Sequence, residues 1–260
     1  MAVTGPGIHP GLPRSEWPPG LSPSGAKTIL KTPAEYKWSR SHPKDPTPDT
    51  ELGTIVHALA LDTPQCWRTI DGGRGVTERR NATRAEGLIP TTLDALAEAA
   101  RMAAAIKAHT EAAQLLDHCT MREVPVFGQD PETGVMVRGQ LDALGDRIAV
   151  DIKTVREGAI GDFARQAVTY GYDVQCAAYA DLLAWAGHPV EVVAFVLVEK
   201  VPPYLVAVRL LDDDFTALGR RKMRRALSLY AECVESGEWP GHEPYAYVSA
   251  PRWALSQEEA

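Results

Sequence analysis

The sequence has no long hydrophobic run, and its first residues do not resemble a secretory leader. No stretch reaches the about 18 consecutive apolar residues that a transmembrane helix requires. Residues 1–6 carry neither a basic start nor an apolar segment. We therefore expect a soluble, cytoplasmic protein without a membrane partner.

Clustered cysteines and an excess of basic charge are also missing. The four cysteines lie far apart and form no CxxC pair, so a structural zinc site is not indicated and we expect reduced thiols. The net charge of −7 excludes a chain that is coated with nucleic-acid-binding charge. A local basic groove remains compatible with this charge, as do carboxylates gathered to hold divalent metals.

The composition fits one globular domain. A chain of 260 residues with 45% hydrophobic content can bury one substantial core. Residues 1–118 are expected to be a mainly helical section, 119–240 an α/β core and 241–260 a C-terminal tail. Residues 71–90 are rich in glycine and arginine without clear periodicity, which favours a mobile loop.

Hydrophobic periodicity and turn residues predict an α/β fold. A three-stranded meander is expected over 124–127, 135–143 and 147–154, where β-rich runs are separated by Pro, Gly and Asp turns. Two further strands are expected over 191–199 and 204–211. Together these strands would form a mixed central sheet flanked by helices. The expected helices span 26–31, 34–40, 51–61, 91–117 with a break near His109, 163–170, 173–186 and 213–236.

Two carboxylates and one lysine are expected to meet on this sheet. In Asp151-Ile152-Lys153 the first and third side chains of a strand point to the same face. Asp142 ends the preceding strand, and the turn at Gly145 would bring it towards Asp151. Such a group suits phosphodiester hydrolysis with Mg²⁺ or Mn²⁺, in which a lysine orients water or stabilises charge. Taken alone, D-x-K is also the pattern of a solvated strand face.

Two helical patterns extend the candidate site. Gly53 lies one turn before His57 on an otherwise apolar helix, which leaves room for a ligand and offers an imidazole to a metal. The alternative is a hydrogen-bonded core histidine. Gln175 and Tyr179 lie four residues apart on one helical face, with Tyr172 on the same side. Their heads could reach a phosphate or a base, although such a pair is also common on ordinary helices.

The ordered set G-x-x-x-H, strand Glu, D…D-x-K and Q-x-x-x-Y resembles the RecB-like branch of the PD-(D/E)xK nucleases. The surrounding segments resemble the RecE-type exodeoxyribonucleases (exonuclease VIII) over nearly the whole chain. Leu141 stands where the name-giving proline would be, and Asp151 replaces the commoner glutamate; neither change removes a carboxylate. The matching segments are 19–24, 36–38, 51–57, 132–135, 141–142, 151–154 and 251–254.

The resemblance implies roles for individual residues. His57, Asp142, Asp151 and the backbone carbonyl of Ile152 would bind metal, and the family implies two ions in each site. Glu123 matches an acidic position of the family and would be a ligand of a metal or of a water molecule. Lys153 would be the catalytic lysine, and Glu123 a further acidic catalytic residue. The family's DNA-contacting and supporting positions correspond to Gln175, Tyr179, Tyr172, Arg74, Arg79, Arg80 and Arg84. Iron–sulfur relatives carry clustered cysteines that have no counterpart here, so no iron–sulfur cluster is expected.

Other basic and aromatic residues are ambiguous. The run from Arg220 to Arg225 could clamp phosphates, but its charges spread around the helix and favour a solvated or subunit-facing surface. Trp17, Trp38 and Trp253 could wedge a duplex end or pack in the core.

The resemblance also implies an activity. It predicts degradation of linear double-stranded DNA from its ends, 5′-to-3′, leaving 3′ single strands for recombination. It further implies ring-like homo-oligomers, such as a tetramer, a RecT-like annealing protein as partner, and a bacterial cell or its bacteriophage as setting. The alternatives are a RecB-like or Cas4-like nuclease of single-stranded or flap DNA, and an inactive DNA-binding module of the same fold.

Overall fold

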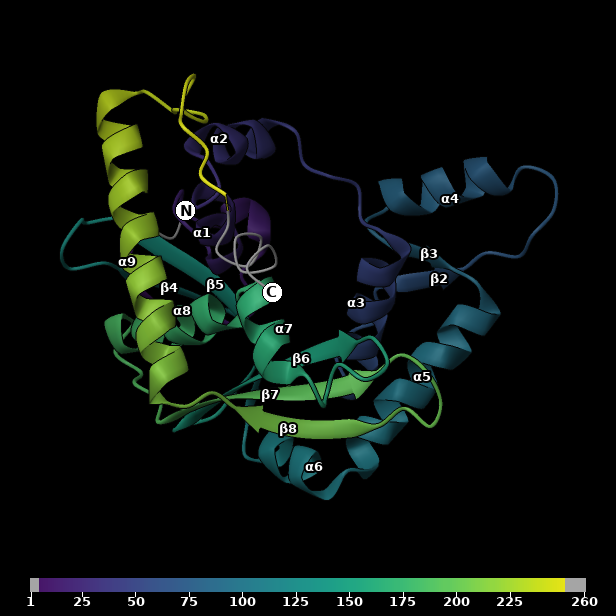
Figure 1. Cartoon of the computed structure of the whole chain (residues 1–260). Coiled ribbons are helices and arrows are strands. Elements are labelled where there is room, and N and C mark those ends of the chain that lie inside the picture. Colours follow the sequence, from purple (N-terminus) through teal and green to yellow (C-terminus); the bar gives the residue numbers. More distant parts are fainter. Residues whose placement is uncertain (1–4, 251–260) are drawn as a thin grey trace, which may run out of the picture.

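The computed structural model describes residues 5–250 of the chain. Its central feature is a six-stranded sheet with helices on both faces (Figure 1). The helical elements are η1 (Arg14–Glu16), α1 (Pro23–Ile29), α2 (Pro33–Ser41), α3 (Pro48–Ala60), α4 (Val76–Ala85), α5 (Leu93–Ala108), α6 (Thr110–Asp117), α7 (Phe163–Tyr170), α8 (Tyr172–Trp185) and α9 (Asp213–Ser236). The strands are β1 (Gly7–Ile8), β2 (Trp67–Thr69), β3 (Ile89–Thr91), β4 (Met121–Gln129), β5 (Met136–Leu144), β6 (Ile148–Val155), β7 (Val192–Glu199) and β8 (Val206–Leu210).

The sheet has the order β1-β4-β5-β6-β7-β8. Strands β6 and β7 are parallel because α7 and α8 connect them, and the other neighbours are antiparallel. The predicted mixed sheet flanked by helices is therefore confirmed, including the meander of β4, β5 and β6. A separate small sheet pairs β2 with β3.

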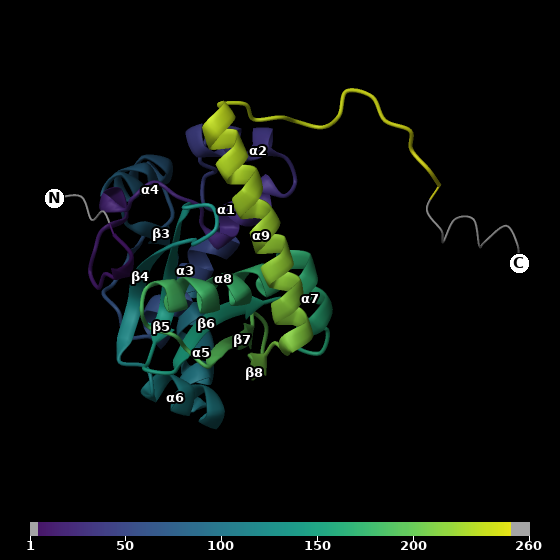
Figure 2. The same ribbon diagram turned by 90° about the vertical axis from the view of Figure 1, so that its left-hand side faces the viewer.

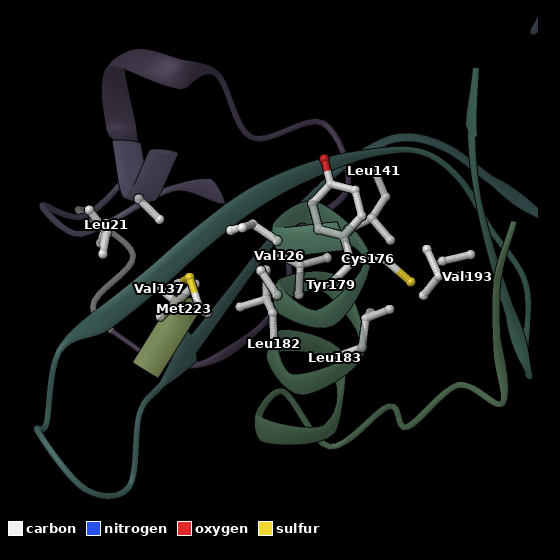
Figure 3. Packing of buried hydrophobic residues seen from close by; sticks show 14 of the residues in the cluster. Leu21, Val126, Val137, Leu141, Cys176, Tyr179, Leu182, Leu183, Val193 and Met223 are labelled. Carbon is white, nitrogen blue, oxygen red and sulfur yellow. The ribbon is translucent and has the colours of Figure 1, made fainter. Parts of the chain in front are cut away.

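The alternation of side chains along the strands builds a core on each face of the sheet. On β7, Phe195 and Leu197 join the core under α1, α7, α8 and α9, whereas Ala194 and Val196 join the core under α3, α5 and α6. Figure 3 shows part of the first core, where Leu182 of α8 lies among residues of the sheet. Each such fully buried leucine contributes roughly 1.5–3 kcal/mol to stability.

Helix α9 crosses α8 at close range and covers one side of the molecule (Figure 2). A Cβ atom at Gly219 would lie 2.0 Å from the backbone oxygen of Asp173, so only glycine permits this approach. The crossing fixes α8, which carries residues of the candidate site. After α9, the described part of the C-terminal segment extends away from the body (Figure 2).

Most helix starts follow the expected capping chemistry. Ser22, Thr32 and Thr47 accept hydrogen bonds from the first turns of α1, α2 and α3, each of which has proline near its start. Helix α3 thus begins earlier than predicted, at Pro48. The predicted break between two helices at His109 is confirmed, since its imidazole caps α6.

The prediction of a structureless loop over residues 71–90 is wrong. This segment contains α4 and the start of β3, and α4 follows a left-handed Gly75 with φ 73°. The glycines at the start of the segment obscured the helical pattern in the sequence. In the structure, Arg84 of α4 forms an ion pair with the buried Glu51 of α3 at 2.7 Å. None of the helices within residues 5–250 is long and apolar enough to cross a membrane.

Candidate active site and metal centre

The site forms where strands β5 and β6 separate. Only Ala143 and Leu144 of β5 pair with β6, opposite Val150 and Ala149. Beyond these pairs the backbone N–H of Ile152 has no backbone partner on β5. The carboxylate of Asp142 accepts this N–H at 2.7 Å, which satisfies a buried backbone donor and fixes the carboxylate between the strands.

Three side chains from different elements converge on one side of Asp142. Ligand atoms of His57, Glu123 and Asp142 all lie within 4.8 Å of one another. His57 comes from α3, and its Nδ1 is 3.4 Å from Asp142 Oδ2. Glu123 comes from β4, where its backbone has a left-handed φ of 49° that few side chains adopt without support. One imidazole and two carboxylates form a donor set that suits a hard divalent cation.

A second group is built around Asp151 and Lys153 of β6, and Lys153 lines the same cavity as His57, Glu123 and Asp142. Asp151 is buried, and its Oδ2 lies 2.6 Å from Nζ of Lys153. Its Oδ1 accepts a hydrogen bond from Gln175 Nε2 at 2.6 Å. Tyr179 accepts from Gln175 at 3.1 Å and donates to the backbone oxygen of Gln140 at 2.8 Å. The ring of Tyr172 lies beneath the Lys153 ammonium, 5.3 Å from its centroid.

The predicted metal ligands therefore have two different kinds of partner in the structure. Asp142 belongs to the group with His57 and Glu123, whereas Asp151 is paired with Lys153 and is not among those three. Gln175 and Tyr179 are buried and hold protein groups, which is a supporting arrangement. Their contact with DNA, and metal ligation by the Ile152 carbonyl, stay predictions.

Burial and neighbouring charges set the protonation of the site. Burial alone would lower the pKa of His57, but the Asp142 carboxylate outweighs it and raises that pKa to about 9. Burial opposes ionisation of Asp142, yet His57 and the Ile152 N–H hold the pKa of Asp142 below its usual value. Burial raises the pKa of Glu123, and the charge on Asp142 adds to this effect.

The pair of Asp151 and Lys153 behaves differently. Burial raises the pKa of Asp151 even though the Lys153 ammonium opposes the shift. Burial would lower the pKa of Lys153, but the carboxylates of Asp151 and Asp142 raise it. Lys153 is consequently an ammonium at neutral pH, available to stabilise negative charge.

Two cavities open onto these groups. The metal-side cavity, about 570 Å³, contains His57, Glu123 and Asp142, and Gly53 lies in its wall. A Cβ at Gly53 would meet Thr154 Oγ1 at 3.3 Å, so the glycine eases the approach of α3 to strand β6. The basic cavity, about 540 Å³, is lined on one side by Gln175 and Tyr179.

Besides the predicted Lys153, the basic cavity is lined by four basic side chains that the sequence did not indicate. Its lining contains no carboxylate, and its cationic residues are Arg14, Lys27, Arg40, Arg138 and Lys153. Arg14, Gln140 and Lys153 line both cavities and so mark their junction. Gln140 lies two residues before Asp142 on a strand, a spacing that could have revealed it. Arg14 and Arg40 lie far from the motif in sequence, and no local pattern indicates them.

The arginines of the segment 71–90 have different surroundings. Arg79 donates to the backbone oxygens of Asp71, Gly72 and Arg74 and closes the turn before α4. Arg84 is engaged by Glu51. Arg74 is exposed and Arg80 is half-buried. Contact of these four arginines with DNA stays a prediction, and Arg79 and Arg84 have structural bonds that compete with it.

The basic run on α9 is largely engaged within the protein. Arg224 forms two hydrogen bonds with the fully buried Asp130, at 2.7 and 2.8 Å, and Arg220 pairs with Asp181 at 3.0 Å. Trp17 packs edge-on against Phe127, whereas Trp38 is 56% exposed. The predicted residue Trp253 and the segment 251–254 lie outside the described residues.

Comparisons with known proteins agree with this architecture. A protein from Eubacterium rectale that is assigned as a candidate exonuclease has a similar structure, with a TM-score of 0.59, 15% sequence identity and 92% of each chain covered. An alkaline exonuclease from Laribacter hongkongensis has 15% identity over 70% of this chain and 91% of its own, but its TM-score of 0.29 is too low to establish a common fold. None of the curated proteins matches the sequence.

The family described as "PDDEXK-like domain of unknown function (DUF3799)" matches residues 22–251. This range includes every candidate site residue named from the sequence, together with the β4–β6 meander and α8. The predicted membership of the PD-(D/E)xK nuclease superfamily is confirmed, as is the predicted fold. The chain belongs to the PDDEXK-like family DUF3799.

Proposed function

We propose that this protein is a metal-dependent exonuclease that degrades linear double-stranded DNA. The observation that carries the proposal is the convergence of His57, Glu123 and Asp142 within 4.8 Å, next to the buried pair of Asp151 and Lys153. This combination joins a site for a divalent cation to a fixed positive charge. Hydrolysis of a phosphodiester needs both, because negative charge develops on the phosphate during attack by water.

The donor set fits Mg²⁺ or Mn²⁺. His57, Glu123 and Asp142 would hold one cation. The resemblance implies two ions in each site, with Asp151 and the Ile152 carbonyl among the ligands. Among the described residues, Oδ2 of Asp151 is buried and accepts no hydrogen bond, although it is ion-paired with Lys153. A metal ion bound by this oxygen would have to share it with the Lys153 ammonium. When bound, the divalent cation lowers the pKa of a water molecule and neutralises charge on the phosphate.

The protein's own residues would position the attacking water and the phosphate. Lys153 lies at the junction of the two cavities, where its ammonium can hold the attacking water or a phosphate oxygen. Gln175 fixes Asp151, and Asp151 in turn fixes Lys153. In the reaction, the water oxygen bonds to phosphorus, the bond from phosphorus to the leaving sugar oxygen breaks, and that oxygen takes up a proton.

The basic cavity gives the DNA strand a place next to the metal side. Its cations would accept backbone phosphates, while the metal-side cavity would take the phosphate that is cleaved. We infer from the family resemblance that the strand is degraded 5′-to-3′, which leaves a 3′ single strand for recombination in a bacterial or bacteriophage setting. A RecT-like annealing protein and a ring-shaped homo-oligomer, such as a tetramer, complete this proposal.

A comparison of substrates tests the activity. End-labelled blunt duplex, single-stranded DNA, flap DNA and a nicked circle would be incubated with Mg²⁺, with and without EDTA. The proposal requires shortening of the blunt duplex from its 5′ ends and no cutting in EDTA. Preferred cutting of single strands or flaps would replace it with a RecB-like or Cas4-like activity.

An inactive variant separates catalysis from binding. Asp151→Asn keeps the size of the side chain but removes the charge that Lys153 pairs with. The variant should still bind labelled duplex in a gel shift, and its cleavage should fall below detection. Cleavage at the parental rate would refute the site assignment, and a parent that binds DNA without cutting it would be an inactive module of this fold.

A further inference from the structure

Gln140 joins the two cavities through a single side-chain amide. It lies on β5, half-buried, and lines both cavities. Its Nε2 donates a hydrogen bond to Oε2 of Glu123 on the metal side. Its Oε1 accepts hydrogen bonds from Nε and Nη2 of Arg14, at 3.3 and 3.2 Å, on the basic side.

The orientation of this amide is fixed by its neighbours. The ionised carboxylate of Glu123 can only accept hydrogen bonds, and the guanidinium of Arg14 can only donate them. A flipped amide would therefore face the wrong partner on both sides. The Gln140 amide thus accepts from the arginine and donates to the acid. If the amide is removed, each partner loses a hydrogen bond.

The partners of Gln140 have few other supports. Glu123 has a left-handed backbone at φ 49°, a costly conformation that the surrounding contacts must stabilise. Arg14 lies in η1, a three-residue helix of the N-terminal segment, where its guanidinium also lies over the ring of Trp17 at 5.2 Å. The bridge to Gln140 connects this segment to the central sheet.

The backbone of Gln140 is held independently of its side chain. The hydroxyl of Tyr179 donates to the Gln140 backbone oxygen at 2.8 Å, and β5 pairs with β4 along this stretch. A substitution of the side chain therefore leaves both backbone contacts in place. The effect of such a substitution reports on the amide alone.

We propose that Gln140 is a positioning residue that holds Glu123 towards the metal ligands and Arg14 towards the DNA phosphate. The proposal rests on the proposed nuclease function and deepens it, because it gives one side chain a role in both the metal-side cavity and the basic cavity. Loss of the amide should weaken metal binding and DNA binding together. A role in packing alone would change neither of these quantities specifically.

The test uses Gln140→Leu, which removes both hydrogen bonds at similar size. The matched control is Gln129→Leu, on the exposed end of the neighbouring strand, where the amide bonds only to the Gly134 backbone oxygen. Mn²⁺ binding to each protein would be measured by calorimetry without DNA, and kcat and KM would be measured on labelled duplex. Gln140→Leu should weaken Mn²⁺ binding about 10-fold or more, as loss of an outer hydrogen-bond partner of a ligand typically does. It should also raise KM, and the control should do neither.

Double variants decide between positioning and packing. In the Glu123→Ala background, Gln140→Leu should cause no further loss of Mn²⁺ affinity, and in the Arg14→Ala background it should cause no further rise in KM. Losses of equal size in both backgrounds, or a lower melting temperature as the only effect, would overturn the proposal. If the parent itself neither binds Mn²⁺ nor cuts duplex, the proposed function fails; if the parent does both and Gln140→Leu matches it, only the role of Gln140 fails.

Discussion

The imidazole of His57 lies 3.4 Å from the carboxylate of Asp142 and links helix α3 to strand β5. The same carboxylate accepts the Ile152 N–H, so Asp142 connects the helix to both strands of the site. In this arrangement His57 is a cation at neutral pH, because its pKa is raised to about 9 against the opposition of burial. A metal ion at this position must displace that proton.

Metal binding should therefore release a proton, and the metal affinity should increase as the pH rises. Between pH 7 and pH 9, the affinity for Mn²⁺ should rise as His57 loses its proton, since only the neutral imidazole can ligate a metal. Calorimetric titrations in buffers with different ionisation enthalpies would count the protons released at pH 7. His57→Gln should release fewer protons and bind Mn²⁺ more weakly. Equal proton release by His57→Gln and the parent would exclude His57 from the metal shell.

The metal-free protein should show the opposite dependence on pH. The folded pKa of His57 is about 9, above the ordinary 6.5, so its interaction with Asp142 stabilises the fold fully below about pH 6.5. That stabilisation is lost as pH rises through about 9. In EDTA, the melting temperature of the parent should exceed that of His57→Gln at pH 6, and this difference should shrink by pH 10. A difference that stays constant would support a packing role for His57.

The strand motif could be predicted from the sequence because the alternation of side chains along a strand depends only on neighbouring residues. Alternation along β6 places Asp151 and Lys153 on one face and buries Ile152 on the other, and a short turn brings Asp142 near. The separation of the strands at Asp142 could not be predicted, because the residues that surround Asp142 come from α3 and β4 and meet only in the folded chain. Arg14 was missed for a similar reason, since only the tertiary fold brings the proline-rich segment to Gln140. Whether the chain is one domain with the predicted section boundaries stays a prediction.

Removal of the Lys153 ammonium should slow cleavage without removing the metal. Lys153→Met keeps an unbranched apolar stem but leaves Asp151 without its cation. The single-turnover rate on duplex should fall about 100-fold or more, the usual loss when one preorganised charge stabiliser is removed. Lys107→Met is the control, because Lys107 pairs with the exposed Asp62 away from both cavities. A rate within twofold of the parent would show that Lys153 takes no part in the reaction.

The ion pair of Arg224 and Asp130 should be important for stability rather than for DNA binding. Asp130 is fully buried, so Arg224→Met removes its charged partner and leaves only the Thr133 donors, which should cost about 3–5 kcal/mol in the free energy of unfolding. Burial opposes the ionisation of Asp130, but Arg224 and Thr133 keep its pKa below the usual value. The stabilisation is thus present above the ordinary carboxyl pKa and is lost as pH falls through the lowered one. In urea unfolding, the difference between parent and variant should be large at pH 7 and should shrink as the pH is lowered below the ordinary carboxyl pKa of about 4.

Arg74 and Arg84 separate DNA binding from anchoring within the segment 71–90. Arg84 pairs with the buried Glu51, so Arg84→Ala should destabilise the protein by about 1–3 kcal/mol, as expected when a buried acceptor loses its charged partner. Arg74 is exposed, and Arg74→Ala should leave the melting temperature unchanged. If Arg74 contacts a phosphate, its removal should lower the salt dependence of duplex binding by about one unit of the log–log slope. Fluorescence anisotropy with labelled duplex in EDTA, at several salt concentrations, would measure this slope. An unchanged slope for Arg74→Ala would place the DNA path away from Arg74.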